Sequence, residues 1–182
     1  MKHYTISLWL ALSALVLSSC ASLSPPPLDK NNMVPRGGEI ACKATGKSLA
    51  LGEFTGQRAK NGAFYLITVN DLKPVVSDGL RNSGMFTAVD LEAEKNTNYK
   101  LNAKILGQPM EGIASITCAL IVDYEITRVG GGEVVYSKRI TGKHTATAGQ
   151  AFQGINRIRM AVEGAARDNV KQLLEDLANR HL

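Results

Sequence analysis

Histidine is scarce in this sequence, and the motifs that carry most enzyme chemistry are missing. The chain has three histidines in 182 residues. His3 lies near the start and His181 is one residue from the end, so His144 is left as the partner for a Ser–His or Cys–His catalytic pair. Neither Cys-x-x-Cys nor His-Glu-x-x-His occurs, and no His and Asp cluster has the spacing of a zinc or calcium site. We therefore expect no enzyme activity, no metal site and no cofactor.

Long hydrophobic runs are also absent. The longest, residues 6–17, follows Lys2 and is almost wholly apolar. It is too short to cross the roughly 30 Å hydrocarbon core of a bilayer, which needs about 20 residues. A basic start, a short apolar run and small residues before a cleavage site are typical of a secretory signal peptide.

The apolar run ends in the sequence LSSC, whose last residue is Cys20. This resembles the lipobox of bacterial lipoproteins, in which the signal is removed before the cysteine and the cysteine is acylated. We therefore expect residues 1–19 to be a signal peptide and Cys20 to be the lipidation site. In Gram-negative lipoproteins, a residue other than aspartate after the cysteine, here Ala21, resembles a signal for export to the outer membrane. An ordinary signal peptide that contains a cysteine is the alternative.

Only two cysteines follow Cys20. An exported protein meets an oxidising compartment, where disulfides persist. A bridge between Cys42 and Cys118 would close a loop of about 75 residues and stabilise the fold by roughly 4 kcal/mol. Two buried free thiols are the equally open alternative.

The segment after Cys20 is rich in serine, proline, asparagine and glycine and has no apolar periodicity. Such a segment cannot bury enough surface to offset the entropy of ordering it. We therefore expect a lipidated tether over residues 20–38 and one periplasmic α+β domain over residues 39–182. The formal net charge of +5 bears mainly on solubility, and we expect no nucleic-acid partner.

Hydrophobic periodicity predicts two helices and several strands. Apolar residues at helical spacing predict helices over residues 69–84 and 150–178. Period-two alternation predicts strands over residues 85–91, 99–105, 116–127 and 133–147, with an earlier strand over residues 48–54. The last two long strands flank three glycines and form a predicted antiparallel hairpin.

The predicted architecture is an antiparallel sheet of four to five strands with two helices packed on one face. The other face would carry four basic residues, Lys100, Lys104, Arg139 and Lys143, together with Asp123 and Glu125. These charges either pair across strands or form a polar surface for a ligand or partner.

The second helix carries four charged residues at intervals of four. We expect Glu163, Arg167, Lys171 and Glu175 to form a solvated face. Glu163 would then pair with Arg167, and Lys171 with Glu175.

Four consecutive segments carry a family resemblance. They are LRNSGMFTAV (80–89), NYKLNAKILG (98–107), IVDYEITRVGGGEVVYSKRIT (121–141) and FQGINRIRMAVEGAARDNVKQLLEDL (152–177). Together they resemble small Gram-negative outer-membrane lipoproteins of unknown function, a group similar to the auxiliary lipoproteins of ABC-type transporters. The helix, the SGMF segment and the following strand also resemble a periplasmic module of penicillin-binding-protein activators and curli-secretion lipoproteins. The resemblance implies no catalytic residues, and Cys42 and Cys118 depart from the pattern.

The sequence thus predicts a lipoprotein on the periplasmic face of the outer membrane. Its expected role is that of a non-enzymatic accessory or assembly factor of an envelope complex for transport or secretion. Its expected partners are the membrane, through the N-terminal lipid, and that protein complex. The alternative is a lipoprotein that itself binds a small ligand, either a lipid or an anionic glycan.

Overall fold

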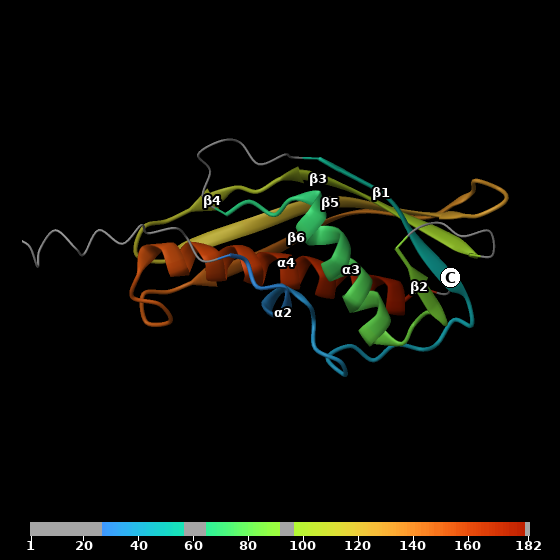
Figure 1. The fold of residues 1–182 in the computed structure, drawn as a ribbon, viewed down its shortest axis with the longest axis horizontal. Coiled ribbons are helices and arrows are strands. Elements are labelled where there is room, and N and C mark those ends of the chain that lie inside the picture. The colour runs from blue at the N-terminus through green and yellow to red at the C-terminus, as the bar shows by residue number, and fades with distance from the viewer. Residues whose placement is uncertain (1–26, 57–64, 92–96, 181–182) are drawn as a thin grey trace, which may run out of the picture.

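The structure, a computed structural model, describes residues 27–56, 65–91 and 97–180. The expected signal peptide and Cys20 lie outside these residues. The described elements form one sheet with helices against one of its faces (Figure 1). In chain order they are α2 (Lys30–Met33), β1 (Ser48–Gly56), α3 (Val69–Ser83), β2 (Ala88–Asp90), β3 (Tyr99–Gly107), β4 (Met110–Glu111), β5 (Ile116–Arg128), β6 (Val134–Ala146) and α4 (Gly154–Ala178).

The α+β class is confirmed, but the prediction of a purely antiparallel sheet is wrong. Strand β1 pairs in parallel with β2 on one side and with β3 on the other. Strands β3, β5 and β6 then follow in antiparallel pairs, and the short β4 pairs with the start of β5. The described sheet is therefore mixed and six-stranded. The prediction of two helices is also corrected, because the described residues include the additional short helix α2.

The parallel pairing follows from the position of α3. The chain leaves β1, forms α3 and returns as β2 beside β1. A helical crossover of this kind joins parallel strands, whereas antiparallel neighbours need only a hairpin. A period-two pattern shows that a segment is a half-buried strand, but it carries no information on the direction of the neighbouring strand.

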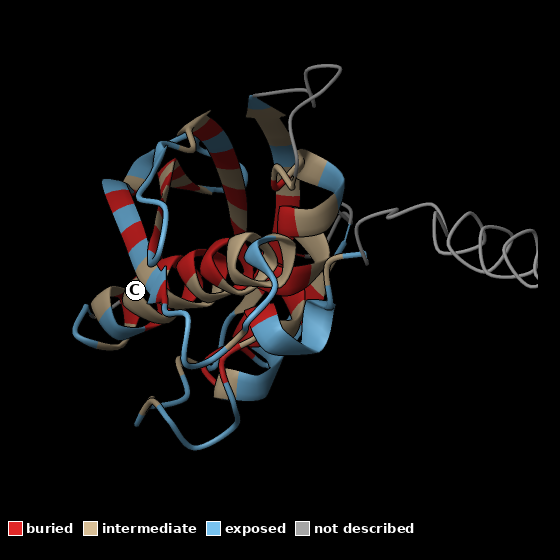
Figure 2. Cartoon of the chain, turned by 90° about the vertical axis from the view of Figure 1, so that its left-hand side faces the viewer, coloured by how far each residue is buried: buried red, intermediate tan, exposed pale blue. Residues whose placement is uncertain are grey.

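The core lies between the sheet and the helices. Along β5 every even-numbered residue from Ile116 to Ile126 is buried, and the odd-numbered residues face the other side. Figure 2 shows this alternation as bands of buried and exposed residues along the strands. One face of the sheet is thus covered by α3 and α4, and the other is open.

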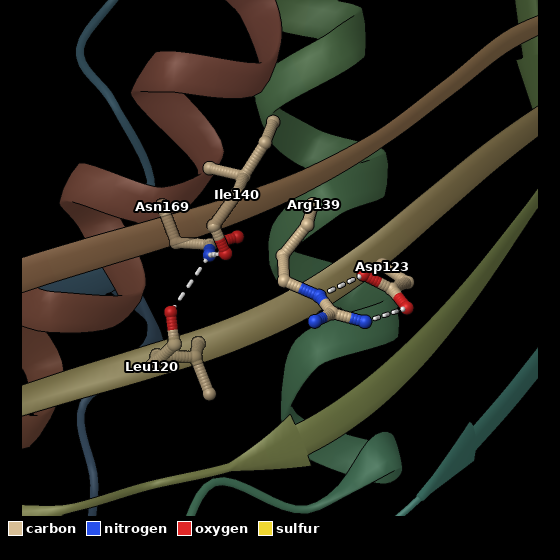
Figure 3. Close-up of polar contacts among 5 residues, drawn as sticks. All are labelled: Leu120, Asp123, Arg139, Ile140 and Asn169. Atoms are coloured by element: carbon tan, nitrogen blue, oxygen red, sulfur yellow. Dashed lines mark hydrogen bonds and ion pairs between the residues drawn. The ribbon is translucent and has the colours of Figure 1, made fainter.

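A buried asparagine joins α4 to the sheet. Asn169 is fully buried, and its amide nitrogen donates hydrogen bonds to the carbonyl oxygens of Leu120 and Ile140, both at 3.0 Å (Figure 3). Its carbonyl oxygen accepts a hydrogen bond of 2.8 Å from the hydroxyl of Tyr124. Every one of these bonds fixes α4 to β5 or β6, so the helix has one register on the sheet.

A glycine allows the close approach that these bonds require. A Cβ atom at Gly142 in β6 would lie 2.2 Å from the carbonyl oxygen of Ala165 and 2.2 Å from the backbone nitrogen of Asn169. No ordinary Cβ contact is that short. The backbone of α4 therefore rests directly on β6 at this point.

The segment before the domain packs against α4. Helix α2 begins after Asp29, whose backbone N–H donates to the Glu163 carboxylate at 2.8 Å. The side-chain amide of Asn32 donates to the other carboxylate oxygen, also at 2.8 Å, and Met33 is buried. Folded contacts therefore begin before residue 39, the predicted start of the domain.

None of the helices in the described part of the chain combines the length and the apolar character needed to span a membrane.

Candidate functional site: the open polar face of the sheet

The open face of the sheet carries a band of polar side chains. These side chains, here called the polar face, come from the positions of β3, β5 and β6 that alternate with the buried core residues. A hollow of about 380 Å³ lies in the middle of this face and is open to solvent. The side chains that line it include those of Glu53, Asn102, Lys104, Asp123, Glu125 and Arg139.

The centre of the polar face is a row of three charges. Lys104 lies opposite Asp123 across β3 and β5, and Asp123 lies opposite Arg139 across β5 and β6. The Arg139 guanidinium donates to both oxygens of Asp123, at 2.7 and 2.9 Å, as Figure 3 shows. A two-point contact of this kind fixes the orientation of both groups. The row has two cations for one carboxylate, and Glu53 and Glu125, which line the same hollow, offset its excess positive charge.

The same contact sets the charge state of Asp123. Hydrogen bonds from Arg139 lower the pKa of this carboxyl below its usual value of 3.8. Burial raises the pKa by a smaller amount, and the positive charges of Arg139 and Lys104 lower it further. Because the folded-state pKa is depressed, the stabilisation is present at neutral pH and is lost as the pH falls through the folded-state pKa. Asp123 is therefore an anion at physiological pH and not a proton donor.

This assignment predicts an NMR result. The carboxyl carbon of Asp123 should titrate with a midpoint below 3.8 in the native protein, and Arg139→Gln should move the midpoint up toward 3.8. Lys138→Gln is the matched control, since Lys138 neighbours Arg139 but pairs with Asp176 of α4. An unchanged midpoint in Arg139→Gln would show that the contact does not hold in solution.

The other two basic residues of the predicted surface lie apart from this row. Lys100 is at the start of β3 opposite Thr127, and its side chain lies over Gly52. Lys143 is near the far end of β6, where its amine is 3.9 Å from Glu111. The structure therefore brings together Lys104 and Arg139 and does not bring Lys100 or Lys143 to them.

The predicted surface did not include Glu53 and Asn102, which are among the polar residues that line the hollow. Both lie at an irregularity where the register of β1 and β3 shifts between Leu51 and Phe54. The Asn102 side-chain oxygen accepts the backbone N–H of Glu53 at 2.9 Å. A bulge re-aims side chains in this way. The glycine at position 52 was the one available signal, because an isolated glycine in a strand often marks a bulge.

A second open hollow, of about 580 Å³, lies along α4. It contains the cations of Arg36, Arg167 and Lys171 and the carboxylates of Glu39, Glu163 and Asp168. Arg167 pairs with Glu39, and Lys171 pairs with Glu175 at 3.7 Å. Since its carboxylates match its cations, this hollow has no excess charge with which to attract an anionic ligand.

The possible disulfide is not formed. Cys42 and Cys118 are both free thiols, the first half-buried and the second buried. Cys42 makes a side-chain hydrogen bond with Ser83 at the end of α3. This end of α3 lies next to the start of β1, and the start of β1 pairs with the start of β3. The start of β3 pairs in turn with Arg128, at the end of β5. Cys118 lies ten residues before Arg128 in the same strand. Ten residues of strand span about 33 Å, so the two thiols lie at opposite ends of the sheet.

The remaining titratable residues show no assembled catalytic group in the described part of the chain. Burial raises the pKa of the Cys118 thiol to about 11, so this thiol is not an activated nucleophile. His144 packs against Gly164 of α4, where a Cβ atom would lie 2.2 Å from the imidazole ring. Within residues 27–56, 65–91 and 97–180, no three His, Cys, Asp or Glu residues are placed to hold a metal ion.

Comparison with known proteins gives a fold and no family. No family model matches the sequence, and no curated protein matches it. Protein XCC0632 from Xanthomonas campestris, of the family DUF330, aligns with a TM-score of 0.59 and 13% identity over 84% of this chain and 92% of that chain. Hypothetical protein CT253 of Chlamydia trachomatis aligns with a TM-score of 0.55 and 8% identity over 73% and 96%.

A third structure with this fold is an assembled protein. A dodecamer of PelC from Paraburkholderia phytofirmans, carrying one substitution, aligns with a TM-score of 0.50 and 17% identity over 78% of this chain and 95% of that chain. At identities this low, the likeness shows a shared fold and nothing about a shared function. The chain therefore shares its α+β fold with small bacterial proteins, among them one of unknown function and one that forms a dodecamer.

Proposed function

We propose that this protein is a lipoprotein of the bacterial envelope, anchored through Cys20, and that it acts as a non-enzymatic accessory or assembly factor of an envelope complex. The observation that carries the proposal is the polar face. It is an open surface with charges paired across strands, and its central acid is held ionised by Arg139. An arrangement of this kind suits recognition of a complementary charged surface more than proton transfer.

The shape of the molecule supports a protein partner over a small ligand. Sites for small molecules enclose most of the surface of the ligand. The hollow on the polar face and the hollow along α4 are both open to solvent, and the space between the sheet and the helices is filled by the buried core. PelC, which shares the fold, is a dodecamer, so the fold is compatible with a place inside a larger assembly.

Site-specific crosslinking in cells tests the proposal. A photoreactive amino acid would replace Ser137, which is exposed beside Arg139 on the polar face. A control chain would carry it at Lys171, on the exposed side of α4. We expect one dominant envelope protein to be captured from position 137 and not from position 171, and the capture to be lost when Cys20→Ala removes the anchor.

Two results would contradict the proposal. Equal capture from both positions would show that the polar face is not the binding surface. A product that contains only further copies of this chain would point to self-assembly instead of a role in a larger complex.

A further inference from the structure

Two loops meet at one end of the sheet. Residues 112–115 lead into β5 and residues 147–153 follow β6, and the strand residues next to them, Ile116 and Ala146, are paired. Both loops therefore project beyond the same end of the β5–β6 hairpin. This is also the end at which α4 begins, as Figure 1 shows.

Each of these loops exposes one large apolar side chain almost completely. Ile113 is 90% exposed and Phe152 is 94% exposed. The other exposed large apolar residues of the described chain are between 37% and 50% exposed. Most apolar residues on a surface need no explanation, but two that stand clear of the protein at the same end form a candidate contact surface.

The loop that carries Phe152 is held in place by hydrogen bonds. The guanidinium of Arg157 donates to the carbonyl oxygens of Ala151 and Phe152, at 2.9 and 2.8 Å. The side-chain oxygen of Gln150 accepts the backbone N–H of Thr147 at 2.9 Å. The ring of Phe152 is therefore displayed to solvent by a loop whose backbone is fixed at both ends.

The loop that carries Ile113 is similarly constrained. Gly112 has a φ of +99°, which a residue with a side chain rarely adopts. A Cβ atom there would lie 2.0 Å from the carbonyl oxygen of Ser115. The turn is tight because of this glycine, and it holds Ile113 at its outer side.

The expected anchor enters the domain close to this end. The first long-range hydrogen bond of the described chain joins Asp29 to Glu163, which lies about 14 Å along α4 from its start at Gly154. Residues 21–28 connect Cys20 to this point. Fully extended, the nine steps from Cys20 to Asp29 reach roughly 30–32 Å, enough for the anchor to lie in a membrane beneath this end of the molecule.

The opposite end of the sheet lies at the limit of the reach of the same anchor. Gly164, beside Glu163, contacts His144, and His144 lies level with Cys118 in β5. From Cys118 to Arg128, where β5 ends, the strand runs about 33 Å. Each end carries one exposed ion pair, Arg128 with Glu133 at 3.1 Å here and Lys143 with Glu111 at 3.9 Å at the other end, so the choice between the ends rests on reach and on the exposed apolar side chains.

We propose that Ile113 and Phe152 insert into the interfacial region of the membrane. The contact orients the domain with this end of the sheet toward the lipid and leaves the polar face free for a partner. The contact adds to the acyl anchor, since apolar tips at a membrane surface bury area in the interfacial region. This inference rests on the lipid-anchor part of the proposed function and does not depend on the identity of the partner.

Tryptophan fluorescence measures the contact directly. The one tryptophan of the chain is Trp9, in the expected signal peptide, so the processed chain with Phe152→Trp would contain a single reporter. The lipidated protein would be reconstituted into vesicles of phosphatidylethanolamine and phosphatidylglycerol in which part of the lipid carries bromine on its acyl chains. Val134→Trp, half-exposed at the opposite end of the hairpin, is the matched control, and mass spectrometry would verify acylation of Cys20.

We expect brominated lipid to quench Phe152→Trp and Ile113→Trp several-fold more than Val134→Trp, with emission shifted to shorter wavelength. Equal quenching at the three positions in an acylated, vesicle-bound protein overturns this inference and leaves the proposed function standing. Strong quenching of Phe152→Trp without any partner captured at position 137 overturns the accessory role and leaves the membrane contact standing. A chain that is not acylated and does not bind the vesicles overturns both.

Discussion

Replacing Gly142 by alanine is expected to lower the free energy of unfolding by about 3 kcal/mol, because the new Cβ atom would overlap the backbone of α4. The overlapping atoms are the carbonyl oxygen of Ala165 and the nitrogen of Asn169, each 2.2 Å from the added carbon. Neither can turn aside as a side chain could, so the helix must shift. A shift would also lengthen the hydrogen bonds of Asn169 to Leu120 and Ile140.

Thermal unfolding checks this expectation. A loss of about 3 kcal/mol should lower Tm by roughly 10 °C in a domain of this size. The matched control is Gly131→Ala in the hairpin turn, where an added Cβ meets nothing within 4 Å. Alanine in a strand is otherwise favoured over glycine by about 0.5–1 kcal/mol, so propensity alone predicts that Gly142→Ala would raise the free energy of unfolding. A Gly142→Ala protein as stable as the control would mean that α4 does not rest on β6.

The elements with a clear period could be predicted from the sequence. The first predicted helix, over residues 69–84, is Val69–Ser83 in the structure, and the long hairpin is Ile116–Arg128 with Val134–Ala146. The helix buries one continuous stripe and β5 alternates strictly, which is the pattern that burial imposes, and β6 is fixed as its partner across the glycine turn. The second helix starts at Gly154 instead of residue 150, because a hydrogen bond from Arg157 to Ala151 and one from the Thr147 N–H to the Gln150 side-chain oxygen hold the preceding residues in a loop.

The features that depend on contacts between distant segments could not be predicted. The sequence around Gly142 does not distinguish it from other strand glycines, because its close contact is with α4, which is distant in the sequence. Alternation predicts that Lys104, Asp123 and Arg139 lie on one face of the sheet. It does not predict that they form one row, because their alignment depends on strand register. Lys100 and Lys143 share that face but occupy other positions along the strands, so charge and alternation alone grouped four residues where the structure groups two.

The N-terminal segment changes the interpretation of α4. Spacing of four residues predicts that Glu163 pairs with Arg167 on a solvated face, and this prediction is wrong. Glu163 is 2% exposed and lies 3.7 Å from Arg159, whereas Arg167 pairs with Glu39. The predicted pair of Lys171 and Glu175 is confirmed. The difference arises because the chain around α2 covers the first half of this face, which the composition of that segment does not indicate.

Glu163→Ala is therefore expected to free this segment and to lower the free energy of unfolding by about 2 kcal/mol. The substitution leaves the backbone N–H of Asp29 and the amide of Asn32 without their acceptor and leaves the Arg159 cation without its carboxylate partner. Both hydrogen bonds are part-buried, and the loss of hydrogen bonds to a charged group costs about this much. Glu163→Gln, which keeps one acceptor oxygen, should lose less.

Limited trypsin digestion separates local release from general unfolding, because Lys30 and Arg36 are cleavage sites within the segment. Local opening that becomes easier by about 1.4 kcal/mol raises cleavage at these sites roughly tenfold. Glu175→Ala is the matched control on the same helix, since its pair with Lys171 is half-exposed and worth little. Cleavage at Lys30 and Arg36 that is equal in the two variants would show that Glu163 does not hold the segment. Faster cleavage in Glu163→Ala would mean that this one buried carboxylate holds the segment around α2 against α4, and under the proposed anchoring at Cys20 it would set how closely the domain can lie against the membrane.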